Sequence, residues 1–210
     1  AKQVQAGKRR GVVQGETGCG KTYCIAYLAW RAAQKNSSVL ILADRRRLID
    51  QMQTVMNKFG VPHGVVMAGK SDDTRSRVIL ASRDTLSRWH EVGRELVDFD
   101  IVLTDECHKV PGDVYQKLLA RYPNSVSIGF SGTPARNDGR SLGDYYQWLE
   151  CTVSASQLIR EGWLIKPEVY APEELAKRRV KGEKIKGLAG DPVQHWLKHA
   201  VGLPTIAFCR

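Results

Sequence analysis

An eight-residue stretch near the start of the chain, GETGCGKT at residues 15–22, most limits the folds that this sequence can adopt. It matches the pattern G-x-x-x-x-G-K-[ST] and directly follows the short apolar run at residues 11–13. In such a stretch, glycines let successive backbone N–H groups point towards an anion at the beginning of a helix. The pattern therefore predicts a phosphate-binding loop between a buried strand and a helix.

The chemistry expected of this loop comes from its glycines, its lysine and its threonine. The glycines allow a close approach to the ligand that a β-carbon would block. The Lys21 ammonium group is expected to reach the β- and γ-phosphates of a nucleotide, and the Thr22 hydroxyl is expected to bind Mg²⁺. The predicted nucleotide-binding residues are Gly15, Glu16, Thr17, Gly18, Cys19, Gly20, Lys21 and Thr22.

Short apolar runs alternate with helical patterns along the first 131 residues. The runs are almost continuously apolar, which is typical of strands buried on both faces of a parallel sheet. They cover residues 11–14, 38–43, 64–68, 77–82, 100–106 and 126–131. Helices are expected between them at residues 21–34, 45–59 and 83–96, the last beginning after Ser82 as its N-cap. This alternation predicts a three-layer α/β fold with a mostly parallel central sheet and ligands at the carboxyl ends of its strands.

The alternation weakens after Pro134. A loop is expected at residues 135–145, a helix at 154–161 and a last strand or its remnant at 168–171. Residues 172–191 are rich in Lys, Arg, Glu and Gly, a composition that favours a linker. The sequence therefore predicts one main domain over residues 1–171, an interdomain segment over residues 172–203, and the first strand of another domain over residues 204–210.

The composition excludes several other classes of protein. A chain of 210 residues with 42% apolar content is long enough for one well-buried domain. The five cysteines form no C-x-x-C pair, which argues against a disulfide framework or a thiolate zinc site and favours a reducing, cytoplasmic setting. No apolar run approaches the roughly 20 residues of a membrane span. The net charge of +10 is compatible with a polyanionic partner such as nucleic acid.

A second motif supplies the acids that nucleotide hydrolysis requires. The stretch IVLTDECHK at residues 101–109 is an apolar run that ends in two adjacent acids. A parallel sheet would deliver these acids to the edge where the phosphates bind. Asp105 is expected to hold Mg²⁺ through water, and Glu106 to orient or deprotonate the attacking water. With Lys21, they are the predicted catalytic residues.

Four motifs, taken in order, resemble those of the first RecA-like motor domain of a superfamily 2 helicase. They are GETGCGKT, ASRDTLSR at residues 81–88, DECH at 105–108 and GFSGTPARNDG at 129–139. More narrowly, the chain resembles the branch that contains type III restriction motor subunits and phage or repair DNA helicases of the DECH kind. The resemblance implies ATP and Mg²⁺ as ligands, nucleic acid as partner with DNA favoured over RNA, and ATP-driven translocation or unwinding.

The resemblance also implies roles for residues outside the two nucleotide motifs. Four would connect the nucleotide state to the nucleic-acid groove, namely His108, Ser131, Gly132 and Thr133. Five would contact the nucleic-acid backbone, namely Arg45, Arg46, Ser82, Arg83 and Thr85. Asp44 departs from the family pattern, which often has proline there, and it places an acid beside the expected path of the phosphates.

Two parts of the family pattern are expected to lie outside this sequence. One is the adenine-reading segment upstream of the phosphate loop, and the other is the second RecA-like motor domain, which residues 204–210 would begin and which carries the arginine fingers. The isolated chain is therefore expected to hydrolyse ATP very slowly. A catalytically silent fragment that acts as a nucleic-acid-binding module is the alternative function. Stimulation of ATP hydrolysis by DNA would distinguish the two.

Overall fold

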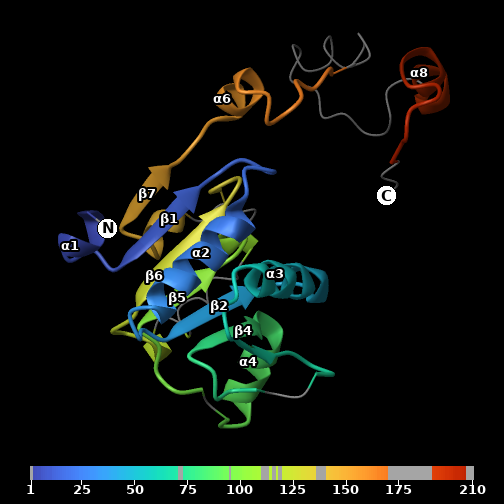
Figure 1. Cartoon of the computed structure of the whole chain (residues 1–210). Helices are drawn as coiled ribbons and strands as arrows, with labels where there is room; N and C mark the ends of the chain where they lie inside the picture. Colours follow the sequence, from blue (N-terminus) through green and yellow to red (C-terminus); the bar gives the residue numbers. More distant parts are fainter. Residues whose placement is uncertain are drawn as a thin grey trace. The chain divides into compact units, whose positions relative to one another are not determined.

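The computed structural model describes residues 2–70, 73–94, 96–109, 114, 117, 120–135, 141–169 and 191–206 (Figure 1). The chain divides into two compact units, Ala1–Leu164 and Ile165–Arg210. The first unit holds the sheet and every predicted functional residue. The domain boundaries expected at residues 171 and 203 stay predictions, and residues 170–190 lie outside the described part of the chain.

A seven-stranded sheet with parallel pairing throughout forms the centre of the first unit. Its spatial order is β3-β4-β2-β5-β6-β1-β7. The strands are β1 (Arg10–Gln14), β2 (Val39–Ala43), β3 (Gly64–Val66), β4 (Val78–Ser82), β5 (Ile101–Thr104), β6 (Val126–Ser131) and β7 (Trp148–Cys151). The first six coincide with the six predicted apolar runs, so the prediction of a mostly parallel α/β sheet is confirmed.

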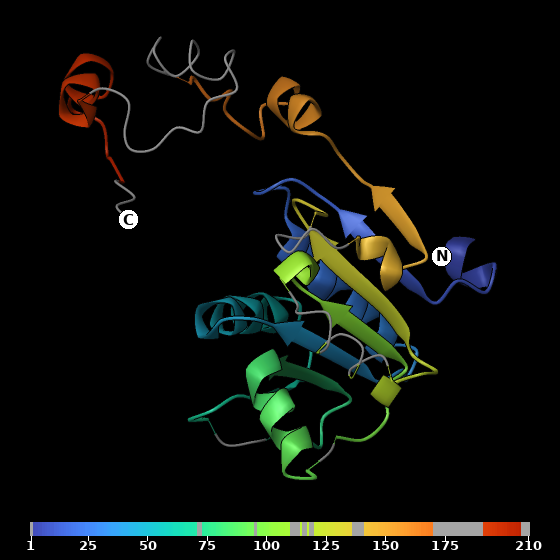
Figure 2. The same ribbon diagram turned by 180° about the vertical axis from the view of Figure 1, so that it is seen from behind.

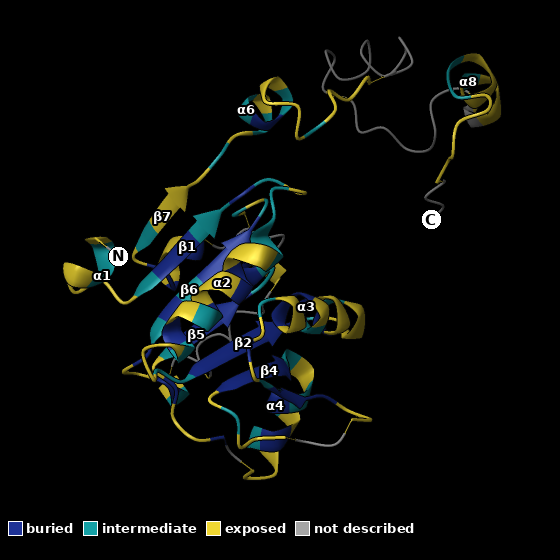
Figure 3. Ribbon diagram, viewed as in Figure 1, coloured by how far each residue is buried: buried dark blue, intermediate teal, exposed yellow. Residues whose placement is uncertain are grey.

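Helices cover both faces of this sheet, as Figures 1 and 2 show from opposite sides. Strand β2 illustrates why, because all five of its residues are buried and they alternate between two apolar clusters. Ile41 packs with residues of α2 (Lys21–Ala33) and α3 (Arg46–Lys58), whereas Leu40 packs on the other face with Trp89 of α4 (Arg83–Glu91). Figure 3 shows the buried strands between helices that keep an exposed outer face.

The remaining described elements are short. They are α1 (Lys2–Gln5), the 3-10 turns η1 (Cys107–Lys109) and η2 (Leu142–Asp144), α6 (Ala155–Arg160), and α8 (Pro192–His199) of the second unit. Helix α6 lies within the predicted range and is capped by Ser154, whose hydroxyl accepts from the Gln157 N–H group. In the described residues, no helix combines the length and the apolar character that crossing a bilayer requires.

Three elements differ from the sequence prediction. Helix α4 ends at Glu91 instead of Leu96, because Gly93 follows with φ of 72° and turns the chain. Strand β7 was predicted as neither strand nor helix. Residues 168 and 169, where a last strand was expected, have no regular structure, and neither do residues 204–206. The rest of those two predicted strands lies outside the described residues.

Strand β7 is an edge strand whose formation depends on a glycine in its neighbour. A β-carbon on Gly11 of β1 would come within 1.9 Å of the Trp148 ring, so only glycine lets this indole lie across the strand. Three of the four β7 residues are exposed, which explains why no apolar pattern marks it. The parallel pairing of β7 with β1 brings the chain after Cys151 back beside the phosphate loop.

Candidate nucleotide-binding and nucleic-acid-binding site

The predicted phosphate loop and the DECH acids lie at the same edge of the sheet. Gly15 directly follows β1, and Asp105 directly follows β5. Strand β6 lies between these two strands, and because all three are parallel their carboxyl ends meet at one edge. The spatial convergence that the two motifs require is therefore present.

The loop itself has the backbone conformations expected of a phosphate cradle. Gly18 and Gly20 both have φ of 87°, a region that strongly favours glycine, and Gly20 is the N-cap of α2. A β-carbon on Gly20 would meet no atom within 4 Å, so the loop is open on that side. Backbone N–H groups at such a helix start attract anions. Thr22 is half-buried in the first turn of α2.

The Lys21 side chain is held above this loop. Its ammonium group donates to the carbonyl oxygens of Gly15 at 3.0 Å and Glu16 at 3.2 Å. Across the loop, a β-carbon on Gly132 would lie 3.7 Å from the Lys21 Nζ atom and 3.5 Å from the Thr17 hydroxyl. The turn that follows β6 therefore packs directly against the phosphate loop.

The two acids of the DECH motif have distinct environments. Burial and the neighbouring Glu106 charge raise the pKa of Asp105, while smaller effects, including the charges of Lys21 and Lys109, lower it. The Asp105 Oδ1 atom accepts from the Glu106 N–H group at 3.0 Å. Glu106 has φ of 48°, a left-handed conformation that costs about 1 kcal/mol or more in a residue other than glycine. Strain of this kind is common at functional sites.

His108 joins the DECH motif to the end of β6. Its Nδ1 atom lies 2.8 Å from the Ser131 hydroxyl and 3.3 Å from Glu106 Oε2. The Ser131 hydroxyl also accepts from the Thr133 N–H group at 3.1 Å. Burial lowers the pKa of His108, although the Glu106 carboxylate opposes this shift. A neutral imidazole with its proton on Nδ1 can donate to both oxygens.

Cys107, between these residues, has a packing role. It is fully buried, and burial raises the pKa of its thiol to about 12, so the thiolate that nucleophilic chemistry needs is not formed near neutral pH. A β-carbon on Gly129 would lie 2.7 Å from the Cys107 Cβ and Sγ atoms. Close packing between η1 and β6 thus requires a small residue at both positions.

Two residues outside the predicted motifs also contact the phosphate loop. The Thr152 hydroxyl lies 3.3 Å from the position of a β-carbon on Gly15, and the Leu164 Cδ2 atom lies 3.2 Å from the position of a β-carbon on Gly18. Thr152 carries no short-range sequence signal, whereas Leu164 lies in the stretch LIREGWLIKP at residues 158–167, which resembles a domain-closing segment of the helicase family. The pairing of β7 with β1 brings Thr152, the residue after β7, to the loop.

The predicted nucleic-acid contacts lie at the carboxyl ends of β2 and β4, which are neighbours in the sheet. Arg45 is exposed as the N-cap of α3. Arg46 donates to the Ala68 carbonyl at 2.8 Å, and the Thr85 hydroxyl accepts from the Ala68 N–H group at 3.2 Å. The Arg46 and Thr85 side chains therefore bind the backbone of the loop after β3. The Arg45 side chain is exposed to solvent.

The other two predicted contacts are more enclosed. Ser82 is half-buried at the end of β4, and although it is the N-cap of α4 its side chain makes no capping hydrogen bond. Arg83 forms an ion pair with Asp44, the residue after β2, with 2.5 Å between Nη2 and Oδ1. No sequence pattern predicted that this acid and this arginine would be partners.

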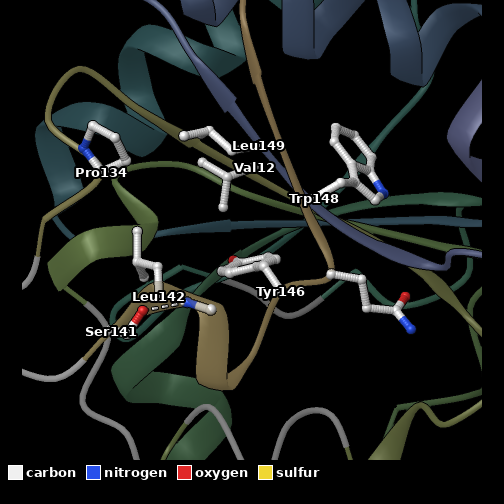
Figure 4. A pocket seen from close by; sticks show the side chains of 9 residues that line it. Val12, Pro134, Ser141, Leu142, Tyr146, Trp148 and Leu149 are labelled. Carbon is white, nitrogen blue, oxygen red and sulfur yellow. Dashed lines mark hydrogen bonds between the residues drawn. The ribbon is translucent and has the colours of Figure 1, made fainter.

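A pocket of about 340 Å³ lies beside β1 and β7. In Figure 4 the side chains of Leu142, Tyr146 and Leu149 lie around Val12. The other lining residues are Pro134, Ser141, Gly143, Gln147 and Trp148. None of the predicted functional residues lines this pocket.

Comparison of the sequence with those of known proteins finds relatives that match most of this chain. A 51.5 kDa protein of Lactococcus phage (isolate 7-9) is 27% identical over 95% of this chain and 43% of its own length. Putative helicase 22 of Sulfolobus islandicus filamentous virus is 28% identical over 81% of this chain and 33% of its own length. The chain thus spans less than half the length of these two relatives.

Solved structures show the same fold. The Pyrococcus furiosus Hef helicase domain matches with a TM-score of 0.60 at 20% identity, over 76% of this chain and 38% of that one.

The family described as type III restriction enzyme, res subunit, matches residues 1–136, which include the phosphate loop, the DECH motif and the Ser131–Thr133 turn. Because this match covers more than half of the sequence, the chain belongs to the family of type III restriction enzyme res subunits.

Proposed function

We propose that this chain is the ATP-binding motor domain of a nucleic-acid helicase or translocase, with DNA as the favoured substrate. The observation that carries the proposal is the meeting of the phosphate loop and the DECH acids at one edge of the sheet. The family match and the shared fold with helicase domains support it. In the intact protein, a second RecA-like domain would complete the motor.

The residues at this edge are suited to Mg·ATP. The N–H groups of residues 15–22 would surround the phosphates, and Lys21 would exchange its contacts with two loop carbonyls for phosphate oxygens. Thr22 and Asp105 offer the oxygen ligands that Mg²⁺ prefers. When bound, Mg²⁺ supplies charge neutralisation on the phosphates, and it would also favour the ionised form of Asp105 against the burial that raises its pKa.

Glu106 is the proposed base that orients or deprotonates the attacking water. Its carboxylate lies 3.3 Å from His108 Nδ1, so the imidazole can hold it in place. His108 in turn contacts Ser131, and the next residue, Gly132, packs against the phosphate loop. A change at the phosphates can therefore pass through this turn to the His108–Glu106 pair, which is the coupling role we propose for Ser131, Gly132 and Thr133.

Nucleic acid is proposed to bind across the carboxyl ends of β2 and β4. Arg45 and the backbone at the start of α3 and α4 would contact phosphates, which positions the protein without reading sequence. The net charge of +10 favours such binding. The contacts that Arg46 and Thr85 make with Ala68 would keep the neighbouring loop in place.

The decisive experiment compares ATP hydrolysis with and without single-stranded DNA, using a protein extended to include a second motor domain. We expect DNA to stimulate hydrolysis and Glu106→Gln to abolish it while Mg·ATP still binds. A protein that binds DNA but shows no hydrolysis above background, with or without DNA, would instead be a silent nucleic-acid-binding module. RNA in place of DNA in the same assay decides between the two substrates.

A further inference from the structure

The Asp44–Arg83 ion pair joins two neighbouring strand ends within the proposed nucleic-acid surface. Ala43 and Ser82 are paired across β2 and β4, and Asp44 and Arg83 are the residues that follow them. The two side chains are 20% and 17% exposed, and Nη2 lies 2.5 Å from Oδ1. By contrast, the Lys70–Asp50 pair nearby is 37% and 53% exposed. The Asp44–Arg83 pair is thus the more enclosed of the two, and screening by solvent weakens it less.

The other nitrogens of the Arg83 guanidinium also face oxygen atoms of the chain. Nη1 donates to the Lys109 carbonyl at 3.4 Å, and Nε lies 3.6 Å from Asp84 Oδ1. Each of the three nitrogens therefore has an oxygen within 3.6 Å. A phosphate group would have to replace at least one of these oxygens to bind this guanidinium by hydrogen bonds.

We propose that Asp44 withholds Arg83 from nucleic-acid phosphate, and so limits the affinity of this chain for a single strand. This inference rests on the function proposed above. The Asp44 carboxylate cancels the Arg83 charge, occupies its donors, and repels an approaching phosphodiester by its own charge. A phosphate reaches the Arg83 guanidinium only when the carboxylate gives way, so the intact ion pair leaves a bound single strand without this contact and lowers its affinity.

The test measures binding of a labelled oligothymidylate to the 210-residue chain. Asp44→Asn removes the charge and nearly preserves the shape, and we expect it to tighten binding about tenfold, the effect of one charge-assisted contact with phosphate. It should also steepen the slope of log affinity against log salt concentration by about 0.7, the value for one additional phosphate neutralised on a single strand. Asp44→Ser, also uncharged, provides a second variant in case the asparagine perturbs folding.

Matched variants separate this mechanism from a general effect of charge. Asp50→Asn removes the same charge from an exposed pair in the same region, and we expect it to tighten binding by less than about twofold. When Arg83 is first replaced by Gln, Asp44→Asn should tighten oligothymidylate binding by less than about twofold. This is the same limit that we expect for Asp50→Asn in the unmodified chain. Unfolding midpoints and affinity for an Mg·ATP analogue, measured on every variant, identify any loss of folding.

Two outcomes would overturn this inference but leave the proposed function standing. One is equal tightening by Asp44→Asn and Asp50→Asn, and the other is tightening by Asp44→Asn that persists without Arg83. If neither the unmodified chain nor the Asp44 variants bind single-stranded DNA or RNA at low salt, the proposed function is overturned together with this inference.

Discussion

The Nδ1 atom of His108 lies 2.8 Å from the Ser131 hydroxyl, which connects the DECH motif to the turn that touches the phosphate loop. Ser131 is fully buried, and its hydroxyl accepts a second hydrogen bond from the Thr133 N–H group. One hydroxyl thus positions both the imidazole beside Glu106 and the backbone beyond β6. The first prediction follows from this contact.

Ser131→Ala is expected to lower the free energy of unfolding by about 1–3 kcal/mol, because two polar groups lose their shared partner. Ser127→Ala is the matched control, since Ser127 is equally buried in the same strand and its hydroxyl makes no hydrogen bond among the described residues. That substitution should change stability little or increase it. Urea unfolding of both variants measures the difference, and equal effects would contradict the role of the Ser131 hydroxyl.

Lys21→Ala is expected to weaken Mg·ATP binding about 10- to 100-fold, the effect of losing a charged contact with phosphate. Lys35→Ala removes the same charge from an exposed position after α2 and should leave affinity unchanged. Calorimetric titration with a non-hydrolysable ATP analogue measures both. Similar affinities for the two variants would show that nucleotide does not bind at this loop.

The 210-residue chain alone is expected to hydrolyse ATP barely above background, even with DNA. Arginine fingers, which the family resemblance assigns to the second motor domain, contribute about 10³–10⁵ in rate in related phosphoryl-transfer enzymes. Steady-state phosphate release measures the turnover, with Glu106→Gln as the blank. A turnover of about one per second that Glu106→Gln abolishes would show that the chain is catalytically complete.

Asp105→Asn is expected to stabilise the folded chain at neutral pH while removing a proposed ligand of Mg²⁺. Burial, followed by the Glu106 charge, raises the pKa of Asp105, so the folded chain binds a proton there more tightly than the unfolded chain does. This group therefore favours folding below its unfolded pKa and opposes folding as pH rises through the folded value. Each unit of difference corresponds to about 1.4 kcal/mol.

The control for this effect is Asp84→Asn, which neutralises a largely exposed carboxylate. Thermal unfolding at pH 7 and at pH 4 without divalent metal compares the variants. The stabilisation by Asp105→Asn should shrink at the lower pH, where the raised pKa leaves a larger fraction of the unmodified carboxyl protonated in the folded chain than at pH 7. Stabilisation of the same size at both values would mean that the buried charge is not its cause.

Single-stranded nucleic acid is expected to bind this chain weakly and with a steep dependence on salt. With a net charge of +10, binding is expected to release counterions from the phosphate backbone, and this gain falls as salt concentration rises. Fluorescence anisotropy across a salt series gives the slope of log affinity against log concentration. An affinity that stays constant across the series would exclude the electrostatic mechanism.

Much of the fold could be predicted from local patterns because its strands are buried on both faces. Six continuous apolar runs became six strands, and the glycine-rich loop follows the first of them at residue 15. Strand β7 could not be predicted in this way, because three of its four residues are exposed and its position depends on the space left by Gly11. Tertiary packing decides such an edge strand, and packing leaves no periodic signal in the strand itself.

The sequence by itself determined which groups can meet at the proposed nucleotide site. Motifs that directly follow parallel strands must reach the same edge of the sheet, so Lys21 and Asp105 lie at one edge, and the strand order decides how near they come. The contacts around the predicted motifs depended on the tertiary structure. The Asp44–Arg83 pair, the His108–Ser131 contact and the approach of Thr152 and Leu164 to the loop all join residues distant in sequence. Strand order and register bring them together, and both arise from packing of the whole sheet.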